Sequence, residues 1–244
     1  MLALAALAIT LGSCKKDEGS PTPEPTPTTG TFKIGYGFHW GADDFDMANT
    51  YTDGNGHAVK FLTARFYFGE PHLMSGGNEV EHFHDTYFLP DASTPEGEFN
   101  VGSIAPGTFD TLELVVGLDS VTNHADPTLA EDPLNDPGMH WSWNPAVGYK
   151  FFLLEGRVDD DGDGVVDAGD PIFSYHCASD EALREVTLSF TGSVDAGGTL
   201  APHMEVRMDQ VVIGVDMLAT PDGMGYEPVN AQLMDNLANA LELL

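Results

Sequence analysis

Cysteine and basic residues are scarce in this sequence, and each scarcity excludes something. The chain has two cysteines, Cys14 near the N-terminus and Cys177, so a disulfide within the main body is not expected. Nine Lys and Arg residues stand against 39 Asp and Glu residues, giving a formal net charge of −30. Such a chain repels phosphate backbones and anionic lipid surfaces, so we expect no nucleic-acid partner. Cations and basic molecules are favoured, although many of the carboxylates serve solubility alone.

The sequence motifs of common enzyme classes are also missing. There is no GxSxG elbow, no HExxH metalloprotease motif, no phosphate-binding loop and no CxxCH haem-attachment site. Paired carboxylates are abundant, but among 39 acidic residues their spacing carries little information. We therefore expect a protein that is not an enzyme.

The N-terminus carries an apolar run that is too short for a membrane span. Residues 1–10 are rich in Leu and Ala, and the tripeptide Leu-Gly-Ser then leads into Cys14. A short apolar run that ends in small residues is typical of a secretory signal. The segment before Cys14 resembles the bacterial lipobox, in which the mature chain begins at a lipidated cysteine. We predict a signal peptide over residues 1–13 and an outer membrane lipoprotein that faces the periplasm or the cell surface. The alternative is an ordinary signal peptide with a chance cysteine.

A tether and a single domain are expected after the signal peptide. Residues 14–30 hold the lipidated cysteine and a Pro/Thr-rich stretch, which is typical of an extended spacer. In this reading the lipid is the only contact with the membrane. Residues 31–244 then form one domain, of a length that is ordinary for a β-sandwich and sufficient to bury a core.

Short segments rich in β-branched and aromatic residues recur along this domain, with Gly- and Asp-containing turns between them. The pattern predicts an all-β fold, an antiparallel β-sandwich. Only residues 229–243 show helical spacing, with Leu233, Leu237 and Leu241 four residues apart, which predicts a short C-terminal helix packed on the sheets. The expected strands cover residues 32–38, 59–68, 111–116, 149–154, 172–175, 185–190 and 204–215.

Residues 159–170 form the sharpest local pattern, a calcium-type loop. Oxygen ligands fall at the spacing of an EF-hand loop, with Gly162 at the position of the sharp turn. The flanking segments look like strands, so the loop is expected to join two strands. An acidic turn without metal is the alternative. The expected calcium ligands are Asp159, Asp161, Asp163, the carbonyl of Val165, Asp167 and Asp170.

The nine histidines are a high count, and several lie beside aromatic residues. His82 and His84 alternate at strand spacing, which places both imidazoles on one face. A single histidine is more often an ordinary surface residue than a metal ligand. As a group, imidazoles close to the thioether of Met139 and the thiol of Cys177 suit copper, although a buried inert cysteine is the more common case.

Several ordered motifs resemble one family. The run GLDSVTNH at residues 117–124 is followed by GMHWSW at 138–143, GYKF at 148–151 and the pair Glu155-Gly156. Together they resemble the MbnP-like copper-binding proteins, which are also called metallo-mystery-pair proteins. The resemblance spans most of the chain from residue 31 to the expected helix.

The resemblance implies a copper-binding β-sandwich and a partner, a diheme cytochrome c peroxidase-like enzyme that oxidises a tryptophan to kynurenine. His124 and His176 match family histidines, and Trp141 and Trp143 match a Met-x-Trp-x-Trp pair. His39 lies in the matching first-strand region. His140 occupies a variable position and is added because of its chemistry. These six residues are the candidate copper ligands, and the protein is expected to be the substrate of the oxidation.

Two functions remain open at the sequence level. The first is an exported lipoprotein that binds copper for its acquisition or handling. The second is a calcium-stabilised cell-surface module that binds a protein or a glycan and no copper. Copper binding requires His39, His124 and His176 to converge on one centre, whereas scattered histidines favour the interaction module.

Overall fold

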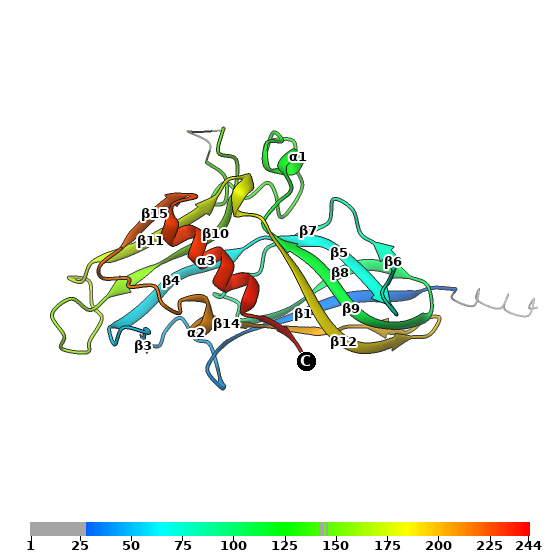
Figure 1. Ribbon diagram of the computed structural model, residues 1–244, viewed down its shortest axis with the longest axis horizontal. Helices are drawn as coiled ribbons and strands as arrows, with labels where there is room; N and C mark the ends of the chain where they lie inside the picture. Colours follow the sequence, from blue (N-terminus) through cyan, green and yellow to red (C-terminus); the bar gives the residue numbers. More distant parts are fainter. Residues whose placement is uncertain (1–27, 142–143, 145) are drawn as a thin grey trace, which may run out of the picture.

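The computed structural model describes residues 28–141, 144 and 146–244 of the chain. The predicted signal peptide, the predicted lipidation site Cys14 and the candidate ligand Trp143 lie outside these residues. The described part is built mainly of β-strands in three sheets, with short helices beside them (Figure 1). The predicted all-β class is confirmed. None of the described helices is long and apolar enough to cross a membrane.

The first sheet is organised by the long strand β1. One edge of β1 pairs with β8 in antiparallel fashion, and the other edge pairs with β13 and β14 in parallel. Alternate side chains of β1, at Phe32, Ile34, Tyr36 and Phe38, are buried, as expected for a strand with one face on the core. The strands are β1 (Gly30–Trp40), β2 (Asp43–Asp44), β8 (Glu96–Ile104), β13 (Thr199–Leu200), β14 (His203–Arg207) and β16 (Leu241–Leu243).

The second sheet contains the strands on either side of the acidic loop. β10 pairs in antiparallel fashion with β4 and β11, whereas β15 joins β11 in parallel. Gly156 lets the strands close up, because an added Cβ would lie 2.3 Å from both the Lys60 carbonyl oxygen and the Phe173 ring. The order is β15 (Asp222–Gly225), β11 (Ile172–Ala178), β10 (Lys150–Val158), β4 (Ala58–Phe66) and β3 (Tyr51–Thr52).

The third sheet is antiparallel throughout its described pairings. Its inner residues, such as Leu73, Leu112 and Val116, join one apolar core with residues of the other two sheets. The strands are β12 (Arg184–Val194), β9 (Gly107–Val116), β5 (Phe68–Ser75), β6 (Asn78–His82) and β7 (Tyr87–Phe88).

The short helices lie at strand ends. The longest, α3, begins with Pro228, which suits the first turn because its missing N–H has no intrahelical partner there. Its residues Leu233, Met234 and Leu237 are fully buried, so the prediction of a short C-terminal helix with an apolar core-facing stripe is confirmed. The helical elements are α1 (Ser120–Asn123), η1 (Asp180–Ala182), α2 (Met208–Val211) and α3 (Pro228–Asn239).

Three predicted elements were wrong in their boundaries. The single strand expected over residues 59–68 is two strands, β4 and β5, which belong to different sheets. The helix expected over residues 229–243 ends at Asn239, and β16 then pairs with β14. The strand expected over residues 204–215 ends at Arg207 and continues as α2. In each segment apolar residues continue across the boundary, because they are buried in either conformation.

Candidate functional site

Trp141 and His176 form the centre of the candidate site. His176 lies in β11, and Trp141 lies just before β10, held by a hydrogen bond from its backbone N–H to the Gly148 carbonyl. The centroids of the indole and imidazole rings are 6.2 Å apart. Two residues that are separated by 35 positions in the sequence are therefore neighbours because β10 pairs with β11.

A carboxylate orients the His176 imidazole. Nε2 of His176 lies 2.9 Å from Oε1 of Glu155, and Ser174 Oγ lies 3.1 Å from the same nitrogen. Burial opposes ionisation of Glu155, but hydrogen bonds from His176 and Ser174 and the charges of His176 and Lys150 outweigh it, so its pKa is lowered. Because a carboxylate only accepts hydrogen bonds, the neutral imidazole carries its proton on Nε2 and its lone pair on Nδ1. A histidine held by a carboxylate in this way is the usual arrangement of a metal ligand.

Asn123 connects the segments that carry the site. Its side chain is fully buried, accepts a hydrogen bond from the Tyr149 backbone N–H at 2.8 Å and donates one to Asp180 Oδ1 at 2.8 Å. The same Asp180 oxygen lies 3.2 Å from Nε2 of His124. α1, the start of β10 and η1 are thereby joined through one amide.

His140 is suited to metal binding because one of its ring nitrogens has no hydrogen-bond partner among the described residues. The residue is 9% exposed, and its Nδ1 is buried with no hydrogen-bond partner among the described residues. Burial lowers the pKa of the imidazole, which keeps the ring neutral and able to offer a lone pair. Its ring meets Tyr149 edge to face, with centroids 4.8 Å apart.

His39 does not join this group. It lies at the end of β1, with Nδ1 3.6 Å from Asp44 and Nε2 3.6 Å from Glu205. Among the described residues, no set of three close metal-binding side chains contains His39, His124 or His176. The expected convergence of the three histidines is thus not observed, because β1 belongs to the first sheet and β11 to the second.

The calcium-type loop joins β10 to β11, as predicted from its flanks. Backbone N–H groups of Gly162 and Gly164 each donate to Asp159 at 2.8 Å, which folds the loop around this carboxylate. Single oxygens of Asp159, Asp161 and Asp163 lie within 4.8 Å of one another. Asp170 instead accepts from the Asp167 N–H at 2.6 Å.

Two neighbouring carboxylates of the loop have pKa values that are shifted in opposite directions. The hydrogen bond from Gly164 is the main cause that lowers the pKa of Asp159. Asp161 accepts a hydrogen bond from the Asp163 backbone, but the negative charges of Asp163 and Asp159 and partial desolvation outweigh it and raise its pKa. A bound cation would relieve this repulsion, so the geometry is compatible with calcium.

Sequence reasoning did not assign roles to Glu155, Asp180 or Asn123. In the sequence, Glu155 stands out only as part of the pair Glu155-Gly156. Nothing in the sequence distinguishes Asp180 from the many other acidic residues. Cys177 is fully buried, and burial raises the pKa of its thiol. That agrees with the expectation of an inert core cysteine.

Comparisons with known proteins support the resemblance. A model of the MbnP family matches residues 29–229. Among solved structures, MbnP from Methylosinus trichosporium is similar, with a TM-score of 0.52 and 15% sequence identity over 75% of this chain and 78% of that chain. At this identity the likeness shows a shared fold. No curated protein matches the sequence.

Proposed function

Because the chain belongs to the MbnP family, we propose that it binds copper for acquisition or handling, at a site around Trp141 and His176. The observation that carries the proposal is the pairing of this indole with an imidazole that a carboxylate orients. Imidazole nitrogen is a good ligand for copper. His124 and the unpaired Nδ1 of His140 are further candidates at the same end of β10 and β11, whereas His39 is not part of this proposal.

Oxidation of a tryptophan to kynurenine would add a ketone and an aniline nitrogen to the donor set. Trp141 is the described candidate, and its position beside His176 supports it. The sequence has no CxxCH motif, so we propose that a separate diheme cytochrome c peroxidase-like enzyme supplies the oxidising power. In this proposal the chain is the substrate of that enzyme and has no catalytic activity of its own.

The proposed location is the outer membrane, with a lipid on Cys14 as the anchor. The short apolar N-terminal run and the Pro/Thr-rich tether support this proposal. The strong negative charge disfavours direct contact with anionic lipid surfaces. Mass spectrometry of the mature N-terminus tests it, and a chain that begins elsewhere than at a lipidated Cys14 would contradict it.

The copper site is tested with the full chain purified from its native host. We expect about one copper per chain and a tryptophan-to-kynurenine mass change on the peptide that holds Trp141, as the donor set predicts. His176→Ala should weaken copper binding by roughly tenfold or more, because it removes a strong donor. His39→Ala serves as the matched control, since its imidazole lies 3.6 Å from Asp44 and from Glu205, away from the proposed site.

Either of two results would contradict the proposal. Unchanged copper affinity in His176→Ala would remove this residue from the site. A chain with unmodified tryptophan and calcium as its only metal would favour the second function, a calcium-stabilised module that binds a protein or a glycan. The acidic loop between β10 and β11 supports this alternative, and so does the failure of His39, His124 and His176 to converge on one centre.

A further inference from the structure

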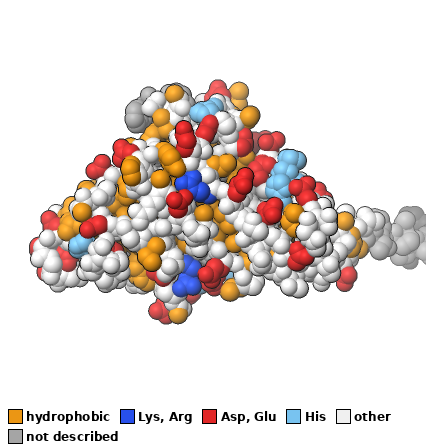
Figure 2. Space-filling model, in the orientation of Figure 1, with side chains coloured by type: hydrophobic (Ala, Val, Ile, Leu, Met, Phe, Trp, Pro, Cys, Tyr) orange, Lys and Arg blue, Asp and Glu red, His pale blue; other side chains and the backbone are white. Residues whose placement is uncertain are grey.

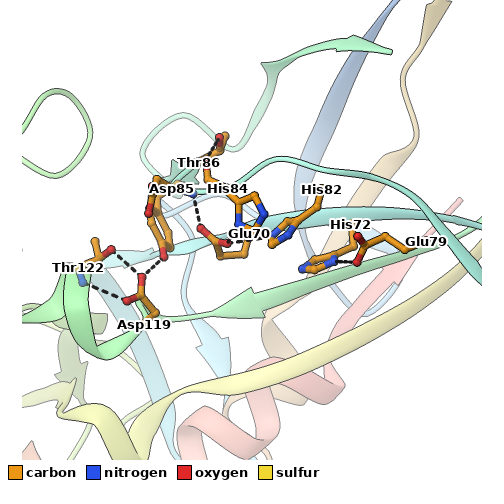
Figure 3. A network of polar contacts seen from close by, with 10 residues as sticks. Glu70, His72, Glu79, His82, His84, Asp85, Thr86, Asp119 and Thr122 are labelled. Atoms are coloured by element: carbon orange, nitrogen blue, oxygen red, sulfur yellow. Dashed lines mark hydrogen bonds and ion pairs between the residues drawn. The ribbon is translucent and has the colours of Figure 1, made fainter. Parts of the chain in front are cut away.

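A second group of histidines lies away from the Trp141–His176 region, on the hairpin formed by β5 and β6. Figure 2 shows it as a patch of histidine side chains among carboxylates, and Figure 3 shows the side chains themselves. Its imidazoles are those of His72, His82 and His84. We call them, with Glu70 and Glu79, the hairpin cluster.

Strand pairing creates the hairpin cluster. His72 of β5 and His82 of β6 are directly opposite in the antiparallel register, so their side chains stand on the same face. Their ring centroids are 3.5 Å apart, with planes at 21°. His84 is two residues beyond His82, and its ring centroid lies 3.4 Å from that of His82. The planes of His82 and His84 are tilted at 50°, so the three imidazoles form one continuous group in which His72 and His82 are stacked.

Glu70 is positioned to complete a ligand set. Its Oε1 accepts a hydrogen bond from the Asp85 backbone N–H at 2.5 Å, which fixes the carboxylate. Its Oε2 then lies 2.9 Å from Nε2 of His82 and 3.7 Å from Nδ1 of His84. The side chains of Glu70 and His82 are only 17% and 15% exposed. The His84 side chain is 73% exposed, so two of the three donor groups are shielded from water and the third faces it.

The backbone is strained where this set is assembled. Glu70 and Asp85 have positive φ angles of 51° and 52°, and among described residues other than glycine only Ser179 shares this feature. L-residues with side chains seldom adopt this conformation, and such strain gathers at functional sites. At Glu70 it accompanies an irregularity in the pairing of β5 with β9, between Gly69 and His72.

We propose that Glu70, His82 and His84 bind a divalent transition-metal ion of the zinc class, separately from the proposed copper site. Ligand atoms of these three residues lie within 4.8 Å of one another. Ligands at about 2.0–2.2 Å from a common zinc ion are about 4 Å apart at most, so small rotations of the side chains are sufficient. Two imidazoles and a carboxylate, with a fourth position open to water, are a donor set that zinc accepts.

His72 and Glu79 are the remaining members of the hairpin cluster, and they lie beside the proposed ligands. His72 stacks on the far side of His82, and its Nδ1 lies 2.7 Å from Oε2 of Glu79. These two also form a close group with His82, but the Glu79 side chain is 53% exposed, whereas that of Glu70 is 17% exposed and is fixed by the Asp85 N–H. We assign His72 as a positioning residue, which keeps the His82 ring in place without binding the ion.

Zinc would replace the hydrogen bond between Glu70 and His82. In the absence of metal, the short contact between Oε2 and Nε2 is a hydrogen bond from the imidazole to the carboxylate. When zinc takes both atoms as ligands, a neutral His82 moves its proton from Nε2 to Nδ1, whereas a charged His82 keeps the proton on Nδ1 and releases the one on Nε2 to solvent. Zinc binding therefore changes the surroundings of the His82 ring nitrogens, which spectroscopy detects independently of the affinity.

The experiment is a titration of the folded chain with Zn²⁺, in buffer with about 10 mM Ca²⁺, which occupies most of a loop of the expected affinity. We expect one zinc equivalent, and His82→Ala, His84→Ala and Glu70→Gln should each weaken binding by roughly tenfold or more, as for the loss of a ligand. His57→Ala, a histidine in the turn between β3 and β4, is the matched control and should bind as the unaltered chain does. His176→Ala should also retain zinc, which separates this site from the proposed copper site.

Two readouts keep the result interpretable. Circular dichroism shows whether each variant is folded, and the visible spectrum of bound Co²⁺ reports imidazole coordination independently of affinity. The Co²⁺ spectrum should change in His82→Ala and His84→Ala but persist in His72→Ala. Zinc binding that survives in folded His82→Ala would overturn the proposal. Binding lost in His72→Ala but kept in His84→Ala would also overturn it, because the ion would then lie between His72, Glu79 and His82.

Discussion

At the scale of single residues, the proposed copper site depends on a few small or polar side chains that never touch the metal. Asn123 connects Asp180 to Tyr149 and thereby holds three separate segments in place. Gly148 makes this possible, because its φ is +80° and an added Cβ would lie 2.3 Å from Oδ1 of Asn123. Asn123 and Gly148 therefore have a structural role beside the proposed site.

Gly148→Ala is therefore expected to destabilise the fold by about 2–4 kcal/mol, combining backbone strain with overpacking. Gly56→Ala is the control, since Gly56 has a φ of +91° but no atom within 4 Å of an added Cβ. The change in the free energy of unfolding in Gly56→Ala should report the cost of the backbone conformation alone. Urea unfolding of both variants measures the difference, and equal costs would mean that the Asn123 contact is easily relaxed.

At the scale of elements, α1 is a helix of one turn that needs its cap. The Asp119 side chain accepts hydrogen bonds from the Val121 and Thr122 backbone N–H groups and from the hydroxyls of Thr122 and Tyr87. Burial raises the pKa of Asp119, but these hydrogen bonds outweigh it and leave the pKa lowered. The ionised cap thus fixes the turn that leads into His124.

The sign of the pH effect follows from the lowered pKa of Asp119. Its stabilisation is complete above the unfolded-state pKa of about 3.9 and is lost as the pH falls through the lower folded-state value. Asp119→Asn should cost about 1 kcal/mol at neutral pH and progressively less in acid, because the amide has one accepting oxygen in place of the two that the carboxylate uses. Denaturant unfolding at several pH values checks this, with Asp43→Asn on the exposed strand β2 as the control. A cost independent of pH would contradict it.

The loop between β10 and β11 gives a second prediction at this scale. With the weak affinity of extracellular calcium sites, about 10⁻⁴–10⁻³ M, 10 mM Ca²⁺ should stabilise the fold by about 1.4–2.7 kcal/mol. Asp161→Ala should remove most of this gain, because its carboxylate lies with those of Asp159 and Asp163. Asp160→Ala, outside the ligand pattern, should keep it. Thermal unfolding with Ca²⁺ and with Mg²⁺ measures the effect, and equal gains in both variants would exclude the loop.

At the scale of the whole molecule, charge is the dominant feature. Acidic side chains are spread over the face shown in Figure 2, whereas Lys and Arg are confined to small groups there. With a formal net charge of −30, repulsion between carboxylates opposes the compact state. Cation binding and ordinary salt are therefore both expected to stabilise the fold.

Raising NaCl from about 10 mM to about 150 mM should increase the melting temperature, because the screening length falls from about 30 Å to about 8 Å. Choline chloride should give the same increase, since the effect is one of ionic strength. CaCl₂ at equal ionic strength should stabilise more, through the acidic loop. A melting temperature that does not change with NaCl would mean that the charges are too widely spaced to repel effectively.

The sequence by itself determined the all-β class, the short helix with its Leu and Met stripe, and an acidic loop between two strands. These features depend on the local periodicity of apolar residues and on the spacing of residues a few positions apart. The ordered motifs around Trp141 and His176 also identified the family without a structure. Side-chain alternation placed His82 and His84 on one face, as the adjacent rings confirm.

Only the tertiary structure decided which distant residues meet. It separated His39 from His176, since β1 and β11 belong to different sheets, and it placed Glu155 against His176. It also brought His72 opposite His82, ended α3 at Asn239 and turned the last residues into a strand. Strand register and sheet membership are properties of long-range pairing, and the local pattern of the chain is compatible with more than one such pairing.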